Sequence, residues 1–310
     1  MTTVLITGGT GMIGKRLTQL LTEKGYEVII LSRQSSVTSH KQSKFSYANW
    51  DIDQQTIDQE AISKADHIIH LAGAGVADKR WSKERKKEIV NSRTQSSALI
   101  VKALKDYPNK VRTVVSSSAI GWYGPDTEKS LEHGFSEDAI ADTAFLGETC
   151  RLWEESIEPV TQLNKRLVKL RTGIVLSNEG GAFVEFKKTL RVGVASILGS
   201  GKQVISWIHV DDLCHLFIAA IENESMSGAY NAVAPHPVTN QYLTLALAKQ
   251  MRGKLYIPVY VPSFVLKIML GELSIEVLKS ANVSSRKVQL TGFDFSYPTV
   301  EDAIAQLCSA

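Results

Sequence analysis

Short apolar runs alternate with amphipathic segments over the first half of the chain. Runs rich in Val, Ile and Leu are typical of buried strands, whereas apolar residues three or four positions apart are typical of helices. Strands that alternate with helices predict an α/β fold with a doubly wound parallel sheet of the Rossmann type. The pattern predicts strands at residues 4–6, 26–31, 45–50, 67–71, 111–118 and 168–175, helices at 15–21, 82–105 and 143–164, and a polar loop at 34–44.

The pattern changes at about residue 176, where glycines and prolines become frequent. We therefore predict a Rossmann domain at residues 1–235, with a substrate-side insertion at about 176–205, and a smaller C-terminal substrate subdomain at 236–310. Residues 206–213 are expected to open a helix that carries an aspartate near its N-terminus.

A glycine-rich turn follows the first predicted strand directly. Its glycines lie at positions 8, 9, 11 and 14, and a helix is predicted after them. Glycine is needed where a turn is tight, where a phosphate approaches the backbone with no Cβ in the way, and where a helix packs near a strand. The helix N-terminus offers free N–H groups and a partial positive charge to an anion. This order of elements predicts a pyrophosphate site for a dinucleotide.

The end of the second predicted strand, at Ser32 and Arg33, bears on the choice of cofactor. Units that select NAD place an acidic residue near this position, where it binds the ribose 2′-hydroxyl. This chain has no acid there, and a serine hydroxyl with a guanidinium suits a 2′-phosphate instead. We therefore predict NADP(H), and the alternative is an arginine that is simply exposed at a strand end.

Small and hydroxyl-bearing residues end two further predicted strands. Leu71, Ala72 and Gly73 end one of them, where small residues let a ribose or a flat ring lie against the backbone. Residues 116–118, all serines, end the other. Ligands of open parallel sheets bind outside the carboxyl ends of the strands, so both groups are expected near the glycine turn.

Composition narrows the class of protein without specifying its chemistry. The 310 residues are 44% hydrophobic and 22% charged, and the net charge is +3. This charge is too small to predict nucleic-acid binding, and no apolar run is long enough to predict a membrane span. The three cysteines have neither metal-ligand nor disulfide spacing. We expect a cytoplasmic protein with a small-molecule substrate and no metal, and the sequence is compatible with a homodimer.

Several motifs resemble the extended short-chain dehydrogenase/reductase superfamily. They are Thr7-Gly8-x-x-Gly11-x-x-Gly14 and residues 70–73, 116–118 and 208–212. More narrowly, the chain is similar to an atypical group of NAD-dependent epimerase/dehydratase-like proteins, the epimerase family with a DUF1731 C-terminal domain. The segments that carry this similarity are residues 78–81, 92–93, 118–124, 153–154, 207–209 and 290–298. The resemblance covers nearly the whole chain and implies a Rossmann fold with an NADP-type cofactor.

The resemblance also implies which residues contact the cofactor. The turn residues would contact the pyrophosphate, Arg33 the 2′-phosphate, Asp51 the adenine edge and residues 71–73 the ribose side. For Asp51 the alternative is a solvated acid in a turn. The full cofactor-binding set is Gly8, Thr10, Gly11, Met12, Ile13, Gly14, Ser32, Arg33, Asp51, Leu71, Ala72 and Gly73.

The chain departs from the superfamily in its catalytic residues. Typical members use a Ser and a Tyr-x-x-x-Lys pair, in which the lysine lowers the pKa of the tyrosine and the phenol transfers a proton as hydride moves. Aligned on Glu154, the tyrosine and lysine positions hold Leu146 and Cys150. Leucine has no proton to give, and a thiol supplies no fixed positive charge.

Two interpretations follow from this departure. In the first, another residue acts as acid or base: Tyr123, unless it is a packed aromatic, or Glu148, unless it lies on a solvated helix face. Ser118 is then the best candidate for the hydroxyl that orients a substrate carbonyl, with Ser116 or Ser117 as alternatives. In the second, the protein binds NADP(H) without turnover and acts as a redox sensor or regulatory module.

The candidate substrate residues are Arg80, Trp81, Arg93 and Trp207. Arg80 is suited to clamp an anion, and the alternative is a structural stack of arginine on tryptophan. The working function is oxidoreductase or epimerase-like hydride chemistry on a small polar substrate. A nucleotide-sugar is one candidate, on fold-level analogy alone.

Overall fold

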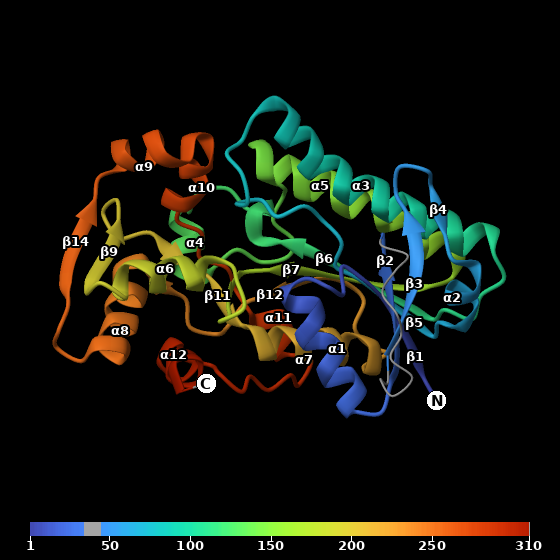
Figure 1. Cartoon of the computed structure of the whole chain (residues 1–310). Coiled ribbons are helices and arrows are strands. Elements are labelled where there is room, and N and C mark those ends of the chain that lie inside the picture. The colour runs from blue at the N-terminus through green and yellow to red at the C-terminus, as the bar shows by residue number, and fades with distance from the viewer. Residues whose placement is uncertain (34–44, 310) are drawn as a thin grey trace.

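An eight-stranded sheet forms the centre of the computed structural model, which describes residues 1–33 and 45–309 (Figure 1). The loop predicted at 34–44 lies outside the described residues. The strand order is β12-β7-β6-β5-β1-β2-β3-β4, and all neighbours pair in parallel except β3 and β4. The strands are β1 (Thr3–Thr7), β2 (Glu27–Ser32), β3 (Phe45–Asp51), β4 (Thr56–Ile57), β5 (His67–His70), β6 (Thr113–Ala119), β7 (Arg166–Thr172) and β12 (Gly228–Ala232).

The strand order reverses beside β1. From β1 the chain continues to β2 and β3 on one side, then crosses to β5 and continues through β6 and β7 on the other. Connections that leave neighbouring strands in opposite directions open a crevice at their carboxyl ends, here between β1 and β5. The predicted doubly wound parallel sheet is therefore confirmed.

Helices cover both faces of this sheet (Figure 1). The main ones are α1 (Met12–Glu23), α2 (Gln59–Lys64), α3 (Lys83–Asp106), α5 (Phe145–Ile157) and α7 (Val210–Glu222). Leu17 of α1 and Phe217 of α7 are buried in the core on one face, and Ile62 of α2 and Leu99 of α3 in the core on the other. Because both faces are covered, every residue of β1 is buried, as its continuous apolar run predicts. None of the helices in the described ranges is both long and apolar enough to span a lipid bilayer.

Two predicted elements end differently in the structure. The helix predicted at 143–164 stops at Ile157, and a short 3₁₀ segment (Glu158–Leu163) follows, with Pro159 in its first turn. The strand predicted at 168–175 is divided at Gly173 into β7 and β8 (Ile174–Leu176). A Cβ at Gly173 would lie 2.6 Å from the carbonyl oxygen of Ser206, so the chain turns where only glycine fits.

A smaller unit combines the segment at about 176–205 with the C-terminal part of the chain. Its strands β9 (Val194–Leu198) and β14 (Ile257–Val261) pair in parallel, β10 (Val204–Ile205) pairs with β13 (Val238–Thr239), and β11 (Trp207–His209) pairs with β8. Residues of three of its helices share one core with Trp207. Its helices are α6 (Ala182–Leu190), α8 (Asn240–Arg252), α9 (Ser263–Leu270), α10 (Ser274–Leu278) and α12 (Val300–Ser309).

The C-terminal part also returns to the sheet domain. The helix expected to open at 206–213 is α7, which begins at Val210 with two aspartates in its first turn. The carboxylate of Asp212 is fully buried and accepts hydrogen bonds from the amides of Ser296 (2.9 Å) and Tyr297 (3.0 Å). Val288 of α11 (Arg286–Gln289) and Phe295 complete the core that α1 and α7 share.

Candidate functional site at the carboxyl ends of the strands

Two glycines of the turn after β1 are required by the fold itself. Gly8 has a φ of +70°, a conformation that favours glycine, and its carbonyl accepts a hydrogen bond from the amide of Gly11 (3.1 Å). A Cβ at Gly14 would lie 2.4 Å from the oxygen of Gly8, far inside contact distance. These glycines let α1 begin directly over the end of β1.

Gly11 differs from both. Its φ is −77°, which any residue adopts, and a Cβ there would meet only the oxygen of Gly8, at an ordinary 3.4 Å. No side chain of the described residues caps α1, and the first turn of the helix carries no acid. The open side of Gly11 therefore leads to free N–H groups at a helix N-terminus, which suits a phosphate. The residues present thus fit the pyrophosphate of a dinucleotide.

A buried hydrogen-bond chain holds the end of β5 against this turn. The hydroxyl of Thr7 accepts from the amides of Leu71 (3.1 Å) and Ala72 (3.2 Å). Its single hydrogen is then donated to Nδ1 of His70 (2.7 Å), so that Nε2 of this ring donates to Ser97 (3.1 Å). Burial lowers the pKa of His70 to about 3, so the ring is neutral. Residues 71–73, predicted to line the ribose, are thereby fixed beside Gly8.

The remaining predicted cofactor residues lie along the same edge. Thr10 is exposed, and Met12 and Ile13 are half-buried at the start of α1. At the end of β2, Ser32 is half-buried and Arg33 is exposed.

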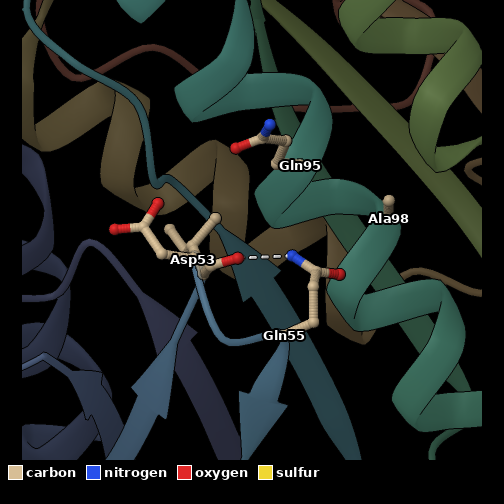
Figure 2. Close-up of a pocket in the computed structure, with 5 residues that line it drawn as sticks. Asp53, Gln55, Gln95 and Ala98 are labelled. Atoms are coloured by element: carbon tan, nitrogen blue, oxygen red, sulfur yellow. Dashed lines mark hydrogen bonds between the residues drawn. The ribbon is translucent and has the colours of Figure 1, made fainter.

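Asp51 lies where β3 turns into β4. Its carboxylate accepts hydrogen bonds from the amides of Asp53 and Gln54, both at 2.9 Å, which makes it a turn acid. A cavity of about 250 Å³ lies between this turn and α3 (Figure 2). The cavity is lined by Ile52, Asp53, Gln55, Gln95 and Ala98. Asp51 therefore lies beside a cavity at the sheet edge, and one oxygen of its carboxylate, Oδ1, accepts both hydrogen bonds of its own turn.

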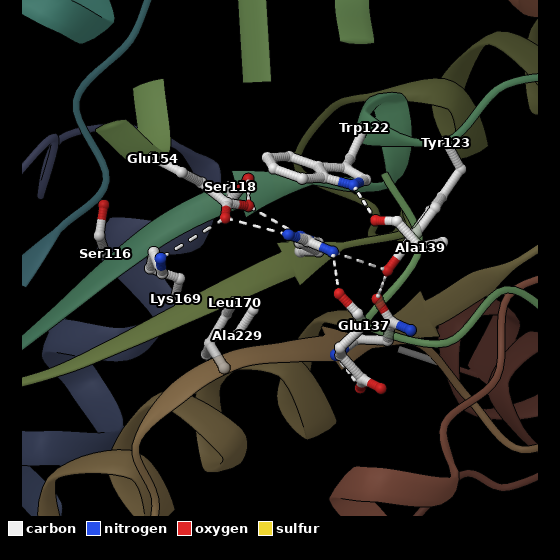
Figure 3. A network of polar contacts seen from close by, with 12 residues as sticks. Ser116, Ser118, Trp122, Tyr123, Glu137, Ala139, Glu154, Lys169, Leu170 and Ala229 are labelled. Atoms are coloured by element: carbon white, nitrogen blue, oxygen red, sulfur yellow. Dashed lines mark hydrogen bonds and ion pairs between the residues drawn. The ribbon is translucent and has the colours of Figure 1, made fainter. Parts of the chain in front are cut away.

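The candidate hydroxyl, Ser118, belongs to a buried polar network (Figure 3). It donates to Oε1 of Glu154 (2.8 Å), whose carboxylate also binds the guanidinium of Arg171 at 2.8 and 3.1 Å. Both ionised groups are almost wholly buried, and Arg171 also lies 3.6 Å from the ring centre of Trp122. The partners compensate each other's charge, which buried charges require. Ser116 is buried as well, and its hydroxyl donates to the carbonyl of Ser117 (3.1 Å).

Tyr123, the leading candidate acid, is fully buried in this network. Its hydroxyl donates to Asn231 (2.6 Å) and accepts from Arg171 (3.1 Å), and its ring stacks on Phe135 with 5.1 Å between centres. Burial raises the pKa of Tyr123 to about 12. The phenol therefore has no exposed surface and holds its proton firmly, as expected for a packed aromatic.

Glu148, the second candidate, is half exposed on α5. Its carboxylate binds Arg151 at 2.6 and 2.8 Å, and this cation lowers the pKa of Glu148. Leu146 and Cys150, at the positions of the missing tyrosine and lysine, both lie near Gly121: a Cβ built there would be 3.2 Å and 3.5 Å from their side chains. Residues two apart on a helix point to different sides, so Glu148 faces away from that position.

The predicted substrate residues do not form one pocket. Arg80 is exposed, and its guanidinium lies over Gly271, whose added Cβ would be 2.7 Å from Nε. Trp81 is nearly buried and packs edge-on against Phe145 (4.8 Å). Trp207 is fully buried, and its indole N–H donates to the carbonyl of His236 (3.0 Å). In this position Trp207 is a core residue and has no surface for a substrate.

Arg93 lies elsewhere in the site. It is buried on α3, and its guanidinium lies 4.9 Å from the ring centre of Trp153. The predicted alternative of an arginine stacked on a tryptophan thus occurs, but with Trp153 and not Trp81. No group of three or more His, Cys, Asp or Glu within the described residues could hold a metal ion.

Sequence reasoning missed the residues that tie this region together. Arg171 follows the buried Leu170 in β7, and a charged residue among the apolar positions of a central strand is a signal that could have identified it. His70 stands at the end of a buried strand and offers the same kind of signal. Asn231, on β12, gives none, because only the folded sheet brings it to Tyr123.

Comparison with known proteins places the chain in a family. Residues 4–145 match the NAD dependent epimerase/dehydratase family, and residues 261–307 match a domain of unknown function, DUF1731. An epimerase family protein of Staphylococcus aureus (strain MRSA252), SAR0825, is 34% identical over 305 residues, which cover 98% of each chain. The protein belongs to the NAD-dependent epimerase/dehydratase family, in the group that carries a DUF1731 domain.

Two solved structures resemble the chain, and each is a little under 30% identical to it in sequence. The human epimerase family protein SDR39U1, solved with NADPH, is 28% identical with a TM-score of 0.86, and the match covers 99% of both chains. The nucleoside-diphosphate sugar epimerase of Corynebacterium glutamicum is 29% identical with a TM-score of 0.76. That match covers 99% of this chain and 58% of the other.

Proposed function

We propose that this chain binds NADP(H) across the carboxyl ends of β1 and β5 and uses it in oxidoreductase or epimerase-like hydride chemistry on a small polar substrate. The observation that carries the proposal is the uncapped N-terminus of α1 beside Gly11, a glycine that the local fold does not itself require. The cofactor, when bound, supplies the hydride chemistry. The residues of the chain bind it, orient it and exclude water.

The preference for the phosphorylated cofactor rests on Ser32 and Arg33. The sequence has no acidic residue from position 32 to position 50 that could bind a 2′-hydroxyl, and Arg33 is exposed, so its guanidinium can form a fork on a phosphate. The human relative was solved with NADPH, which supports the same choice.

The test is the variant Arg33→Ala. We expect its Kd for NADPH to rise about tenfold or more, because a charge-assisted pair of hydrogen bonds is lost, with no change in the Kd for NADH. Fluorescence titration with both cofactors measures the two constants. Arg286→Ala, which removes an exposed arginine on α11, controls for net charge. An equal change with both cofactors, or none with either, would contradict the assignment.

A nucleotide-sugar is the substrate class that the comparisons favour. The Corynebacterium relative carries the name of a nucleoside-diphosphate sugar epimerase, at 29% identity. Tyr123 and Glu148 remain the candidates for proton transfer, and Ser118 remains the candidate for orienting a substrate carbonyl. Ser118 and Tyr123 meet in the network around Arg171.

A second function, binding without turnover, has a specific observation in its favour. The phenol of Tyr123 is fully buried and donates to Asn231, the carboxylate of Glu148 binds Arg151, and the hydroxyl of Ser118 is bound to Glu154. None of these three groups is free at the surface within the described ranges. A redox sensor or regulatory module needs none of them as an acid.

One experiment separates the two functions. The NADPH-loaded protein is mixed with a panel of carbonyl compounds and nucleotide-sugars, and both NADPH absorbance and sugar isomers are followed. Turnover that Tyr123→Phe abolishes while NADPH binding persists supports the enzyme. Tyr26→Phe is the matched control, because that hydroxyl bonds to Glu222 on the surface. Saturable NADPH binding with no turnover of any compound favours the sensor.

A further inference from the structure

Arg93 is a buried cation with no acidic partner among the residues that the structure describes. Its residue is 9% exposed, and one nitrogen, Nη1, donates to the carbonyls of Ala74 (3.0 Å) and Ile89 (2.9 Å). The other two nitrogens, Nε and Nη2, form no hydrogen bond with any described residue. No carboxylate of the described residues lies within 4.0 Å of the guanidinium.

The other strongly buried arginines are compensated. Arg171 binds both oxygens of Glu154, and Arg85 binds Glu88 at 2.7 Å and lies 3.5 Å from Asp78. Taking a cation out of water costs free energy that a partner anion normally offsets. The face of Trp153 offsets part of this cost for Arg93. Burial still lowers the pKa of Arg93, which an adjacent anion would oppose.

The position of this unpaired charge coincides with the proposed cofactor site. A Cβ built on Gly73 would lie 3.2 Å from Cζ of Arg93, so the guanidinium packs on the segment that continues from β5 past the glycine turn. It also lies close enough to the thiol of Cys150 to interact with it electrostatically. Burial raises the pKa of Cys150 to about 12, so this residue contributes no charge of its own.

We propose that Arg93 is the anion-binding residue of this site and binds an oxygen anion of the ligand, either a phosphate of the dinucleotide or a carboxylate of the substrate. It thereby supplies, from α3, the positive charge that the superfamily places on α5 at the position of Cys150. This inference rests on the proposed function for the identity of the cofactor. The burial of Arg93 without an acidic partner among the described residues does not depend on the proposed function.

Two titrations distinguish the sources of the anion. The first measures the Kd for NADPH by fluorescence in the parent, Arg93→Gln and Arg93→Lys. If the anion is a phosphate of the cofactor, Arg93→Gln raises this Kd about tenfold or more, and Arg93→Lys recovers part of the loss. The second adds oxalate to the NADP⁺-loaded protein and follows the unfolding temperature. If the anion is a substrate carboxylate, oxalate stabilises the parent saturably and Arg93→Gln abolishes the effect.

Arg166→Gln is the matched control. Arg166 lies at the start of β7, at the far end of the sheet. Among the described residues its guanidinium also donates only to carbonyls, those of Ala220, Ile221 and Met226. Its charge lies at the C-terminus of α7, where the helix dipole stabilises it. We expect this variant to lose stability but to keep both titrations at parental values.

The proposal is overturned if a folded Arg93→Gln matches the parent in both titrations. If Arg93→Gln does not fold, Arg93→Met takes its place, because it removes the charge and keeps a long, unbranched side chain that can fill the same space. Unchanged titrations in that variant overturn the proposal equally. A parent that shows no NADPH binding, yet is stabilised by inorganic pyrophosphate or oxalate through Arg93, refutes the proposed cofactor and leaves the anion site standing.

Discussion

Two glycines only three positions apart in the first turn serve different purposes. Gly14 has no room for a Cβ, since the oxygen of Gly8 would lie 2.4 Å away, whereas Gly11 has room and an ordinary φ. The fold itself requires glycine at position 14, whereas at position 11 the requirement for glycine would come from the proposed phosphate ligand.

Alanine substitutions separate these requirements. We expect Gly14→Ala to lower the free energy of unfolding by about 3 kcal/mol or more, because backbone atoms must move. Gly11→Ala should cost less than about 1 kcal/mol and raise the Kd for NADPH at least about tenfold. Chemical denaturation and NADPH titration measure the two effects. A Gly11→Ala variant that binds NADPH like the parent would refute the phosphate site.

The buried ring of His70 predicts a dependence of stability on pH. Its pKa, about 3 in the folded state, lies below the unfolded value of about 6.5, so the unfolded chain takes up a proton first as the pH falls. The stability that the neutral ring contributes is complete above about pH 6.5 and is lost as the pH falls toward 3.

The variant His70→Asn removes this titration and keeps an acceptor near Thr7. Between pH 7 and pH 5 the parent should lose about 2 kcal/mol more unfolding free energy than the variant, as measured by denaturant melts. His133→Asn, which removes an exposed ring, should follow the parent. Identical losses in the parent and in His70→Asn would show that the buried ring is not neutral.

Some residue roles could be predicted from the sequence, and others could not. The turn was predictable because its strand, glycines and helix are contiguous, so local geometry fixes their relation. The surroundings of Tyr123 were not, because its partner Asn231 is 108 positions away and meets it only once β12 has joined the sheet. The same holds for Arg93, whose contact with Gly73 depends on how α3 lies on β5.

At the scale of elements, Glu154 of α5 joins that helix to β7 through a buried ion pair with Arg171, and Lys169 of β7 lies 3.7 Å from the same carboxylate. Arg171 and Glu154 bind through both oxygens of the carboxylate, and Ser118 of β6 adds a third hydrogen bond. Replacing one partner leaves an uncompensated charge in the interior. These contacts therefore help to fix how α5 lies against β6 and β7.

We predict that Glu154→Gln lowers the free energy of unfolding by about 3–5 kcal/mol, because the charge of Arg171 is left unpaired. The double variant Glu154→Gln/Arg171→Met should recover part of this loss, and a thermodynamic cycle from denaturant melts measures the coupling. Glu155→Gln, one position along on the exposed face, is the control. A loss in Glu154→Gln as small as that of the control would mean that the pair is solvated.

Two element boundaries were predicted wrongly although a Pro or a Gly marks each of them in the sequence. Pro159 and Gly173 both stand at the points where a predicted helix and a predicted strand end early. The pairing of β9 with β14 could not be predicted, because nothing local relates two short strands more than fifty residues apart.

At the scale of the whole molecule, ligand binding and folding are linked. Saturation of the parent with NADPH at 100 times its Kd should raise the free energy of unfolding by about 2.7 kcal/mol, because the ligand binds only the folded chain. Gly11→Asp should show no such gain, since its carboxylate repels the phosphates. Thermal melts with and without NADPH provide the comparison, and an equal shift in both proteins would exclude binding at the turn.

The hydrophobic core of the sheet domain includes residues from the C-terminal part of the chain. Phe295, far along in the C-terminal part, packs in the same cluster as Leu17, and the carboxylate of Asp212 is satisfied by the amides next to it. A nascent chain on the ribosome therefore cannot finish its first core until residue 295 has emerged. A fragment that stopped at residue 235 would leave the carboxylate of Asp212 without the amides of Ser296 and Tyr297, and would expose the apolar surface that Phe295 covers. Chaperones bind exposed apolar surface of this kind, so we expect such a fragment to depend on them.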